Sequence, residues 1–155
     1  MENVLYLIIP CYNEEAVLPE TASRLLEKMH SLMRQNKIDE KSRIIFVNDG
    51  SGDRTWELIR GLHQGDKIFG GINLSRNRGH QNALLAGLMT VKECADMVIS
   101  MDADLQDDID AIDEMIDKYL KGTDIVYGVR SSRKKDTFFK KATAEGFYKI
   151  MNAMG

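Results

Sequence analysis

The sequence predicts an α/β fold in which a mostly parallel sheet is covered by helices on both faces. Short apolar runs alternate along the chain with segments whose apolar residues recur at helical spacing. Strands that alternate with helices are joined by right-handed crossovers, and such a sheet is parallel and doubly wound. Because ligands of these sheets bind at the carboxyl ends of the strands, we expect the functional site at that edge.

The first half of the chain supplies three expected strands and two expected helices. Val4 to Pro10 is a nearly continuous apolar run, typical of a strand that is covered on both faces. A helix is expected from Glu14 to about Asn36, where apolar residues recur at helical spacing. The next expected elements are a strand at 44–47, a helix at about 54–63 and a strand ending near Leu74.

The second half continues the alternation. Gly79 to Gln81 opens a third expected helix, and the apolar run at 97–101 reads as a fourth strand. The helix that begins near Ile109 is expected to stop at Gly122, since glycine is favoured just after a helix. The apolar residues 125–127 predict a fifth strand.

Composition limits the class of protein. The 155 residues allow one domain with a substantial core, and a net charge of −3 is too small to indicate a nucleic-acid partner. Cys11 and Cys94 are far apart and have no metal-binding spacing, so a zinc site and a disulfide framework are not supported and a reducing cytoplasm fits best. The sequence has no apolar run of about 18 residues, and its charged first residues, followed by an expected strand, are not expected to act as a signal peptide.

Carboxylates, amides and arginines follow all five expected strands. These clusters are residues 10–14, 48–51, 75–79, 102–107 and 128–130. Each cluster taken alone can be a polar loop. A polar loop after every strand is harder to explain without a ligand at this edge of the sheet.

The most informative cluster is the pair Asp102 and Asp104 directly after the fourth strand. In a turn, both side chains can direct oxygens at one hard cation such as Mg²⁺ or Mn²⁺, with other positions left for water and phosphates. The alternative is a solvated acidic turn in which Asp107 or Asp108 caps the next helix.

The ligand class follows from what accompanies this pair. The chain has no glycine-rich phosphate loop after its first strand, so neither a dinucleotide site nor a nucleoside triphosphatase is supported. A metal on the two aspartates could hold a diphosphate instead. Asp49, at a strand end beside Gly50, is placed to accept a hydrogen bond from the imide N–H of uracil or guanine. Together these features suggest a nucleoside diphosphate that carries a group to be transferred.

Four segments resemble the signature segments of the family-2 inverting glycosyltransferases. They read IPCYNEE at 9–15, VNDGSGDRT at 47–55, LSRNRGHQ at 74–81 and MDADLQD at 101–107. The chain is most similar to the branch of dolichol-phosphate mannose synthases and bacterial polyprenyl-phosphate (bactoprenol) glucosyltransferases. The resemblance implies a GT-A, Rossmann-like fold, a nucleotide-sugar donor and Mg²⁺ or Mn²⁺.

The resemblance also assigns roles to individual residues. Those expected to bind the donor nucleotide are Pro10, Tyr12, Glu14, Val47, Asp49 and Ala103. Those expected to be catalytic are Asp102, Asp104, Gln106 and Arg130, the first three as the metal site and Arg130 near the phosphates. Asp107 and Asp108 stand where the family often has His-Pro or Asp-Pro, which leaves the acceptor-side loop open.

Four further polar residues have two interpretations each. Arg76 and Arg78 could steer the anionic donor, although surface arginines are more often simply solvated. His80 is expected to cap or pack at the start of its helix rather than act as a base, and Asp53 to cap the following helix rather than touch ligand.

The C-terminal segment differs from the rest of the chain. We expect a catalytic domain at 1–130 and a basic amphipathic segment at 131–155, the start of an interface helix in a truncated longer protein. Seven basic residues stand against two acidic ones between Arg130 and Lys149. Such a helix can lie on anionic lipid headgroups, or it can pack on its own domain with a solvated basic face.

These observations lead to one functional expectation and two alternatives. We expect transfer of a sugar, glucose favoured, from a nucleoside-diphosphate donor, UDP favoured, to a polyprenyl phosphate at the cytoplasmic face of the cell membrane, with the fragment itself soluble. The acceptor is already anionic, so inversion in one displacement needs no general base. The alternatives are a GT-A enzyme acting on a saccharide or protein hydroxyl and a non-catalytic nucleotide-binding module. Whether the chain forms a homo-oligomer is left open by the sequence.

Overall fold

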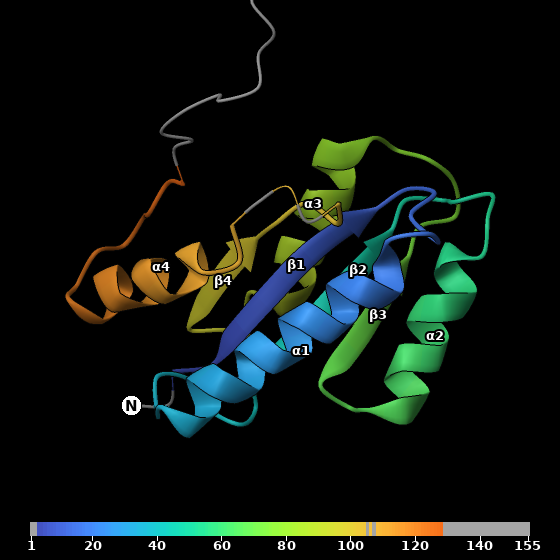
Figure 1. Ribbon diagram of the computed structural model, residues 1–155. Helices are drawn as coiled ribbons and strands as arrows, with labels where there is room; N and C mark the ends of the chain where they lie inside the picture. The colour runs from blue at the N-terminus through green and yellow to red at the C-terminus, as the bar shows by residue number, and fades with distance from the viewer. Residues whose placement is uncertain (1–2, 105, 107, 129–155) are drawn as a thin grey trace, which may run out of the picture. The chain divides into compact units, whose positions relative to one another are not determined.

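The computed structural model describes residues 3–104, 106 and 108–128. Strands and helices alternate through the compact unit formed by residues 1–124 (Figure 1). In chain order they are β1 (Leu5–Cys11), α1 (Leu18–Arg34), β2 (Arg43–Asn48), α2 (Thr55–Gly65), β3 (Phe69–Asn73), α3 (His80–Val91), β4 (Met97–Ser100) and α4 (Ala111–Leu120).

The four described strands form one parallel sheet in the order β3-β2-β1-β4. In the central strand Leu7 pairs with Ile44 of β2 and with Ile99 of β4. The chain therefore builds outward from β1 to β3 and then returns to the other side of β1. This change of direction lies between β1 and β4, and the carboxyl ends of two such strands are where open α/β sheets bind ligands. The parallel sheet predicted from the sequence is confirmed.

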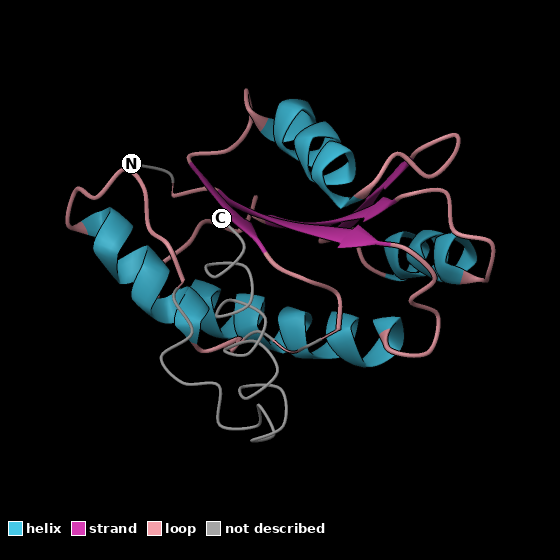
Figure 2. Cartoon of the chain, turned by 90° about the horizontal axis from the view of Figure 1, so that it is seen from above, coloured by secondary structure: helices cyan, strands magenta, loops and turns pink. Residues whose placement is uncertain are grey.

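Helices cover both faces of the sheet, three on one face and α3 on the other (Figure 2). The alternation of side chains along a strand explains the division. Leu7 and Ile9 of β1 belong to the larger apolar core, which also contains buried residues of α1, α2 and α4. Ile8 points the other way and is buried with Val47 and Ala83 beneath α3. Strands covered on both faces read as continuous apolar runs, as the sequence of β1 does.

A glycine brings α3 close to the sheet. Gly87 is buried within α3, and a Cβ atom at this position would collide with Ile8 Cγ2 and lie 3.1 Å from Val47 Cγ2. Glycine inside a helix costs about 1 kcal/mol relative to alanine, so the residue is explained by this close packing. The contact fixes α3 against β1 and β2, and with it His80 at the carboxyl edge of the sheet.

Helices α1 and α4 end in the same way. Asn36 and Gly122 adopt positive φ angles of 55° and 92°. The next amides, of Lys37 and Thr123, donate to carbonyls of the last helical turn at 3.0 and 3.1 Å. This is the Schellman arrangement, which satisfies carbonyls that a helix end leaves without partners. The predicted stop at Gly122 is confirmed.

One helix start and one strand predicted from the sequence need correction. Helix α1 begins at Leu18 rather than at Glu14, because Pro19 favours the first helical turn and the amides of Glu14 and Glu15 are engaged by side chains of another loop. The fifth strand predicted at 125–127 is wrong: these residues have no regular secondary structure. Three apolar residues between Asp124 and Gly128 are too few to specify a strand, which forms only where a neighbour pairs with its backbone.

Two other expectations concern residues that the structure does not describe. Arg130 and the segment 131–155 lie outside the described residues. Within the described part, every helix is too short or too polar to cross a bilayer.

Candidate functional site

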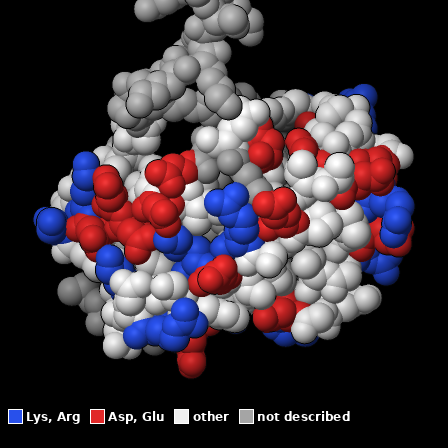
Figure 3. All heavy atoms as spheres, in the orientation of Figure 1, with Lys and Arg blue, Asp and Glu red and all other residues white. Residues whose placement is uncertain are grey.

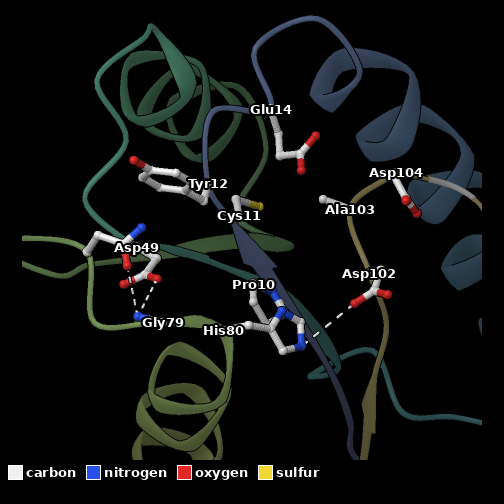
Figure 4. Close-up of a pocket in the computed structure, with 11 residues that line it drawn as sticks. Pro10, Cys11, Tyr12, Glu14, Asp49, Gly79, His80, Asp102, Ala103 and Asp104 are labelled. Carbon is white, nitrogen blue, oxygen red and sulfur yellow. Dashed lines mark hydrogen bonds and ion pairs between the residues drawn. The ribbon is translucent and has the colours of Figure 1, made fainter.

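A pocket of about 430 Å³ opens at the carboxyl ends of β1, β2 and β4, beside the start of α3 (Figure 4). It is lined by Pro10, Cys11, Tyr12, Glu14, Asp49, Asn77, Gly79, His80, Asp102, Ala103 and Asp104. Its position is the edge that the sequence predicted, next to the change of chain direction between β1 and β4.

Seven of the ten residues predicted for the site line this pocket. They are Pro10, Tyr12, Glu14, Asp49, Asp102, Ala103 and Asp104. Val47 does not: it pairs with Pro10 in the sheet, and its side chain is buried in the core beneath α3. Gln106 is exposed and is not among the lining residues, although its backbone amide bonds to Asp104. Arg130 lies outside the described residues.

The lining residues divide between two sides of the pocket. Tyr12 and Asp49 lie on one side, at the ends of β1 and β2, and Asp102 and Asp104 lie on the other, after β4 (Figure 4). The Glu14 side chain enters the same hollow from the loop after β1. One wall therefore offers an aromatic ring and a hydrogen-bond acceptor, whereas the opposite wall is acidic.

Asp49 is buried, with 3% of its surface exposed, and its carboxylate is well bonded. One oxygen accepts a hydrogen bond from the Arg78 amide at 2.6 Å, and the other accepts from the Gly79 amide at 2.9 Å. These bonds hold the loop before α3 against the end of β2. Each carboxylate oxygen can accept a second hydrogen bond, so Asp49 retains capacity for a ligand.

Gly50 lets the loops after β2 and β3 meet. It has a positive φ of 66°, and a Cβ atom there would collide with the backbone of Arg76 and Asn77. A side chain at this position would therefore separate the two loops as well as strain the turn. The glycine is required for the placement of Asp49 beside its two backbone donors.

The segment after β4 is anchored by its middle residue. Ala103 is buried, and its carbonyl oxygen accepts a hydrogen bond from Thr21 Oγ1 of α1 at 2.7 Å. The flanking Asp102 and Asp104 remain exposed, and both line the pocket. Asp104 Oδ1 also accepts from the Gln106 amide at 3.1 Å, which tightens the turn. A small residue fits between the two aspartates because it is packed against the domain.

The electrostatics of the pocket favour a cation. Desolvation raises the pKa of Glu14, and the negative charges of Asp104, Asp53 and Asp102 raise it further. Among the described residues that line the pocket there is no lysine or arginine. The carboxylates of Glu14, Asp102 and Asp104 therefore repel one another, and a bound positive charge would relieve that repulsion.

His80 reaches the acidic wall from the start of α3. Its Nε2 lies 3.7 Å from Asp102 Oδ1, and both side chains are about half exposed (Figure 4). The sequence placed His80 correctly at the helix start but gave it no place in the pocket. The signal was present, since Asn77, Gly79 and His80 all belong to the LSRNRGHQ segment at 74–81 that follows the third strand.

Cys11 lines the pocket without offering a nucleophile. Its thiol is buried and donates to the Ile9 carbonyl at 3.3 Å. Burial raises the pKa of this thiol far above its usual range, and the charge of Glu14 adds to the effect. A neutral thiol is a poor nucleophile, so covalent chemistry at Cys11 is not supported.

The sequence identifies the family. Residues 6–154 match the family described as "Glycosyl transferase family 2". The chain belongs to this family. The resemblance derived from the four segments is confirmed, and with the family comes the GT-A fold expected for the domain.

Two relatives show how far the likeness extends. The chain is 53% identical over 152 residues to "Uncharacterized glycosyltransferase YkoT" of Bacillus subtilis, covering 98% of this chain and 45% of that protein. It is 36% identical over 146 residues to "Bactoprenol glucosyl transferase" of Shigella phage SfV, covering 94% of this chain and 45% of that protein. The glycosyl transferase family 2 chain thus spans just under half the length of these relatives.

Solved structures show the same fold at low sequence identity. The structure of S. aureus TarS 1-349 matches with a TM-score of 0.53 and 18% identity, covering 86% of this chain and 40% of that one. TarS 1-349 in complex with UDP matches with a TM-score of 0.52 and 21% identity over the same shares of the two chains. At this identity the likeness supports the α/β fold of the family and nothing finer.

Proposed function

We propose that this chain is the donor-binding part of a glycosyltransferase that moves a sugar from a nucleoside diphosphate to a polyprenyl phosphate. The observation that supports this most is a pocket with Tyr12 and Asp49 on one side and Asp102 and Asp104 on the other. A nucleoside diphosphate has the matching polarity, with a base at one end and anionic phosphates at the other. Glucose and UDP are the favoured sugar and donor, in keeping with the bactoprenol glucosyl transferases among its relatives.

The nucleoside would lie against the side of Tyr12 and Asp49. Pro10 and Glu14 also line the pocket and would contact the nucleoside, and Ala103 would face the ribose. The remaining acceptor capacity of Asp49 suits the imide N–H of uracil. Val47 supports this wall from behind, because its side chain is in the core and it pairs with Pro10 in the sheet.

The acidic wall fits a hard divalent cation, Mg²⁺ or Mn²⁺. Asp102 and Asp104 would supply oxygen ligands. Gln106 lies close by, since its backbone amide donates a hydrogen bond to Asp104 Oδ1. In the described part of the chain, no group of three or more His, Cys, Asp or Glu side chains is arranged to hold a metal. The ion would therefore need further ligands from water and the diphosphate, as Mg²⁺ commonly does. When bound, it would neutralise charge on the departing diphosphate.

The transfer itself needs little from the protein beyond orientation. An oxygen of the acceptor phosphate forms a bond to the anomeric carbon while the bond from that carbon to the nucleoside diphosphate breaks. The acceptor is already anionic, so no residue has to remove a proton, and displacement in one step inverts the anomeric centre. Tyr12 and Asp49 hold the donor, and Arg130 is proposed to stabilise the departing phosphates.

With a lipid as acceptor, the proposed reaction takes place at the membrane, and we propose its cytoplasmic face. We propose that the basic segment 131–155 lies on the lipid surface, where its lysines and arginines would attract both headgroups and the acceptor phosphate. A second copy of the chain is left open as a partner.

Calorimetry with the chain and a panel of UDP, GDP and ADP, with and without Mn²⁺, tests the donor site. We expect UDP to bind best and Mn²⁺ to strengthen its binding at least tenfold, about 1.4 kcal/mol. The full-length protein should then convert UDP-glucose and polyprenyl phosphate to UDP and polyprenyl-phosphate glucose. Failure of UDP to bind under both conditions would contradict the donor site, and binding without lipid transfer would contradict the acceptor.

A further inference from the structure

The loops after β1 and β2 are joined by reciprocal hydrogen bonds that we call the two-loop clasp. The clasp consists of the side chains of Asn13, Glu15, Ser51, Asp53 and Thr55 together with backbone amides of the opposite loop. None of these five residues lines the pocket among the described residues. The proposed function gives them no role.

Three consecutive amides of the first loop donate to the second loop. The Asn13 amide donates to Ser51 Oγ at 2.9 Å, the Glu14 amide to Thr55 Oγ1 at 2.9 Å and the Glu15 amide to Asp53 Oδ2 at 3.1 Å. These amides precede α1, and the bonds satisfy donors that would otherwise have to find water.

Two amides of the second loop donate in return. The Gly52 amide donates to Asn13 Oδ1 and the Arg54 amide to Glu15 Oε2, both at 2.8 Å. Asn13 makes these contacts with a positive φ of 56°, a conformation that asparagine tolerates better than most residues. Each loop is therefore fixed by side chains of the other.

The clasp and the pocket use alternate residues of one segment. Asn13 and Glu15 direct their side chains to the second loop, whereas Tyr12 and Glu14 line the pocket. We propose that the clasp is a positioning element: its residues set Tyr12 and Glu14 for the donor without touching it. This inference rests on the proposed donor site and assigns the NDGSGDRT segment a second task besides base recognition by Asp49.

Thr55 is the residue that best tests the clasp. It is fully buried, its hydroxyl oxygen accepts from the Glu14 amide, and the hydroxyl donates to Asp53 Oδ1 at 2.6 Å. Thr55→Val keeps the shape but leaves the partly buried Glu14 amide and an Asp53 carboxylate oxygen without the Thr55 hydroxyl as a partner. Thr55→Ser retains the hydroxyl and serves as the rescue variant.

Ser42 provides a matched control at the opposite end of the sheet. It is also fully buried, and its hydroxyl accepts from the Leu5 amide at 2.9 Å, so Ser42→Ala removes the same kind of bond. The Leu5 amide begins β1, whereas the clasp follows the end of β1. Both substitutions should lower Tm, but only the substitution in the clasp should weaken UDP binding at the pocket.

The experiment measures UDP affinity in the presence of Mn²⁺ and amide hydrogen exchange at residues 13–15. We expect Thr55→Val to weaken UDP binding about tenfold and to raise exchange at Glu14 and Glu15 at least tenfold, while Thr55→Ser and Ser42→Ala stay within about threefold of wild type. Equal losses of affinity in Thr55→Val and Ser42→Ala would overturn the inference.

The two measurements also separate this inference from the proposed function. If wild-type protein does not bind UDP, the donor assignment fails, but exchange still reports on the clasp. Raised exchange in Thr55→Val with unchanged exchange in Ser42→Ala would then support positioning of residues 13–15. Unchanged exchange in Thr55→Val would overturn it whatever the ligand.

Discussion

Carboxylates gather in two regions of this chain, the pocket and the contact between α1 and α4, and the two regions treat their charge differently. Over α4, basic side chains stand between and beside the acidic ones (Figure 3). In the pocket, four carboxylates line one hollow, and the described lining residues include histidine but no lysine or arginine. In the first region lysines of the fold pair with aspartates, whereas no lysine or arginine is among the described residues that line the second.

Lysines of α1 and of the turn after it form ion pairs with three aspartates at the start of α4 and along it. Lys28 Nζ lies 2.7 Å from both Asp110 Oδ1 and Asp113 Oδ2, and Lys37 Nζ lies 2.7 Å from Asp117 Oδ1. Burial acts to lower the pKa of Lys28, but the hydrogen bonds to both aspartates outweigh it and raise the pKa. The same bonds lower the pKa of Asp110. Here charge contributes to stability.

The comparison supports the proposal that the pocket carboxylates bind a ligand. Glu14 has a raised pKa and Asp110 a lowered one, although both are acidic residues near other acidic residues. Desolvation and the neighbouring carboxylates raise the pKa of Glu14, whereas the hydrogen bond and charge of Lys28 lower that of Asp110. A site that binds a metal has to leave the position of such a cation open, and it destabilises the unliganded fold to some extent.

The largest expected effect is on the pocket. Asp104→Asn removes a charge from the acidic wall and should weaken Mn²⁺-dependent UDP binding about 100-fold, or about 2.7 kcal/mol, by calorimetry. Without Mn²⁺ the variant and the wild type should bind UDP equally weakly.

The matched control is Asp113→Asn, in the paired region. It removes the same charge from an aspartate bonded to Lys28, so Tm should fall while UDP affinity stays within about twofold. If the two substitutions weakened UDP binding equally, the proposal that only the pocket carboxylates serve ligand binding would be contradicted. Unchanged Mn²⁺ dependence in Asp104→Asn would refute the metal assignment.

An intermediate effect is expected from Lys28→Met. The lysine side chain is only 16% exposed and bridges two aspartates, so its loss should lower Tm by roughly 2–4 °C at low salt. The difference in Tm between the wild type and Lys28→Met, measured by thermal unfolding, should become smaller as NaCl is added, because salt screens the ion pairs. Lys92→Met, which loses an exposed pair with Glu93, should change Tm by less than about 1 °C. A larger fall in Lys92→Met would contradict this ranking.

The smallest effect is a gain in stability from Glu14→Gln. Because the folded state raises the pKa of Glu14 above 4.5, the wild type loses stability as pH rises through that raised value. Gln removes this loss, so Tm at pH 7 without metal should rise by roughly 1–2 °C, with no gain below pH 4. Thermal unfolding across this pH range gives the answer. A lower Tm at pH 7, or the same gain at pH 4, would show that the carboxylates do not repel one another as described.

The sequence predicted the sheet well because its strands are covered on both faces. β1 and β2 appear as apolar runs, and polar clusters mark where they end. The segment at 125–127 has the same apolar character, but pairing depends on a neighbouring strand that no local pattern specifies. The early helix start at Glu14 has a similar cause, because the competing bonds come from Ser51, Asp53 and Thr55, far along the chain.

Within the site, sequence reasoning was best for residues whose chemistry is unusual at a strand end. Asp49, Asp102 and Asp104 fall in the pocket as predicted. Val47 was expected to bind the donor nucleotide, but its side chain lies in the core, because the direction of a strand residue depends on which face each helix covers. His80 was given no place in the pocket because its proximity to Asp102 arises from the packing of α3, which spacing along the chain does not reveal.

The glycine in the middle of α3 makes the distance between helix and sheet a determinant of the pocket. Any side chain at Gly87 would press on Ile8 and Val47, and α3 would have to move outward. His80 and Gly79 lie two turns away, at the start of the same helix. If α3 moved outward, His80 would move away from Asp102 and Gly79 would move away from Asp49. A methyl group added on the side of the sheet away from the main core would thus widen the mouth of the pocket without altering any residue that lines it.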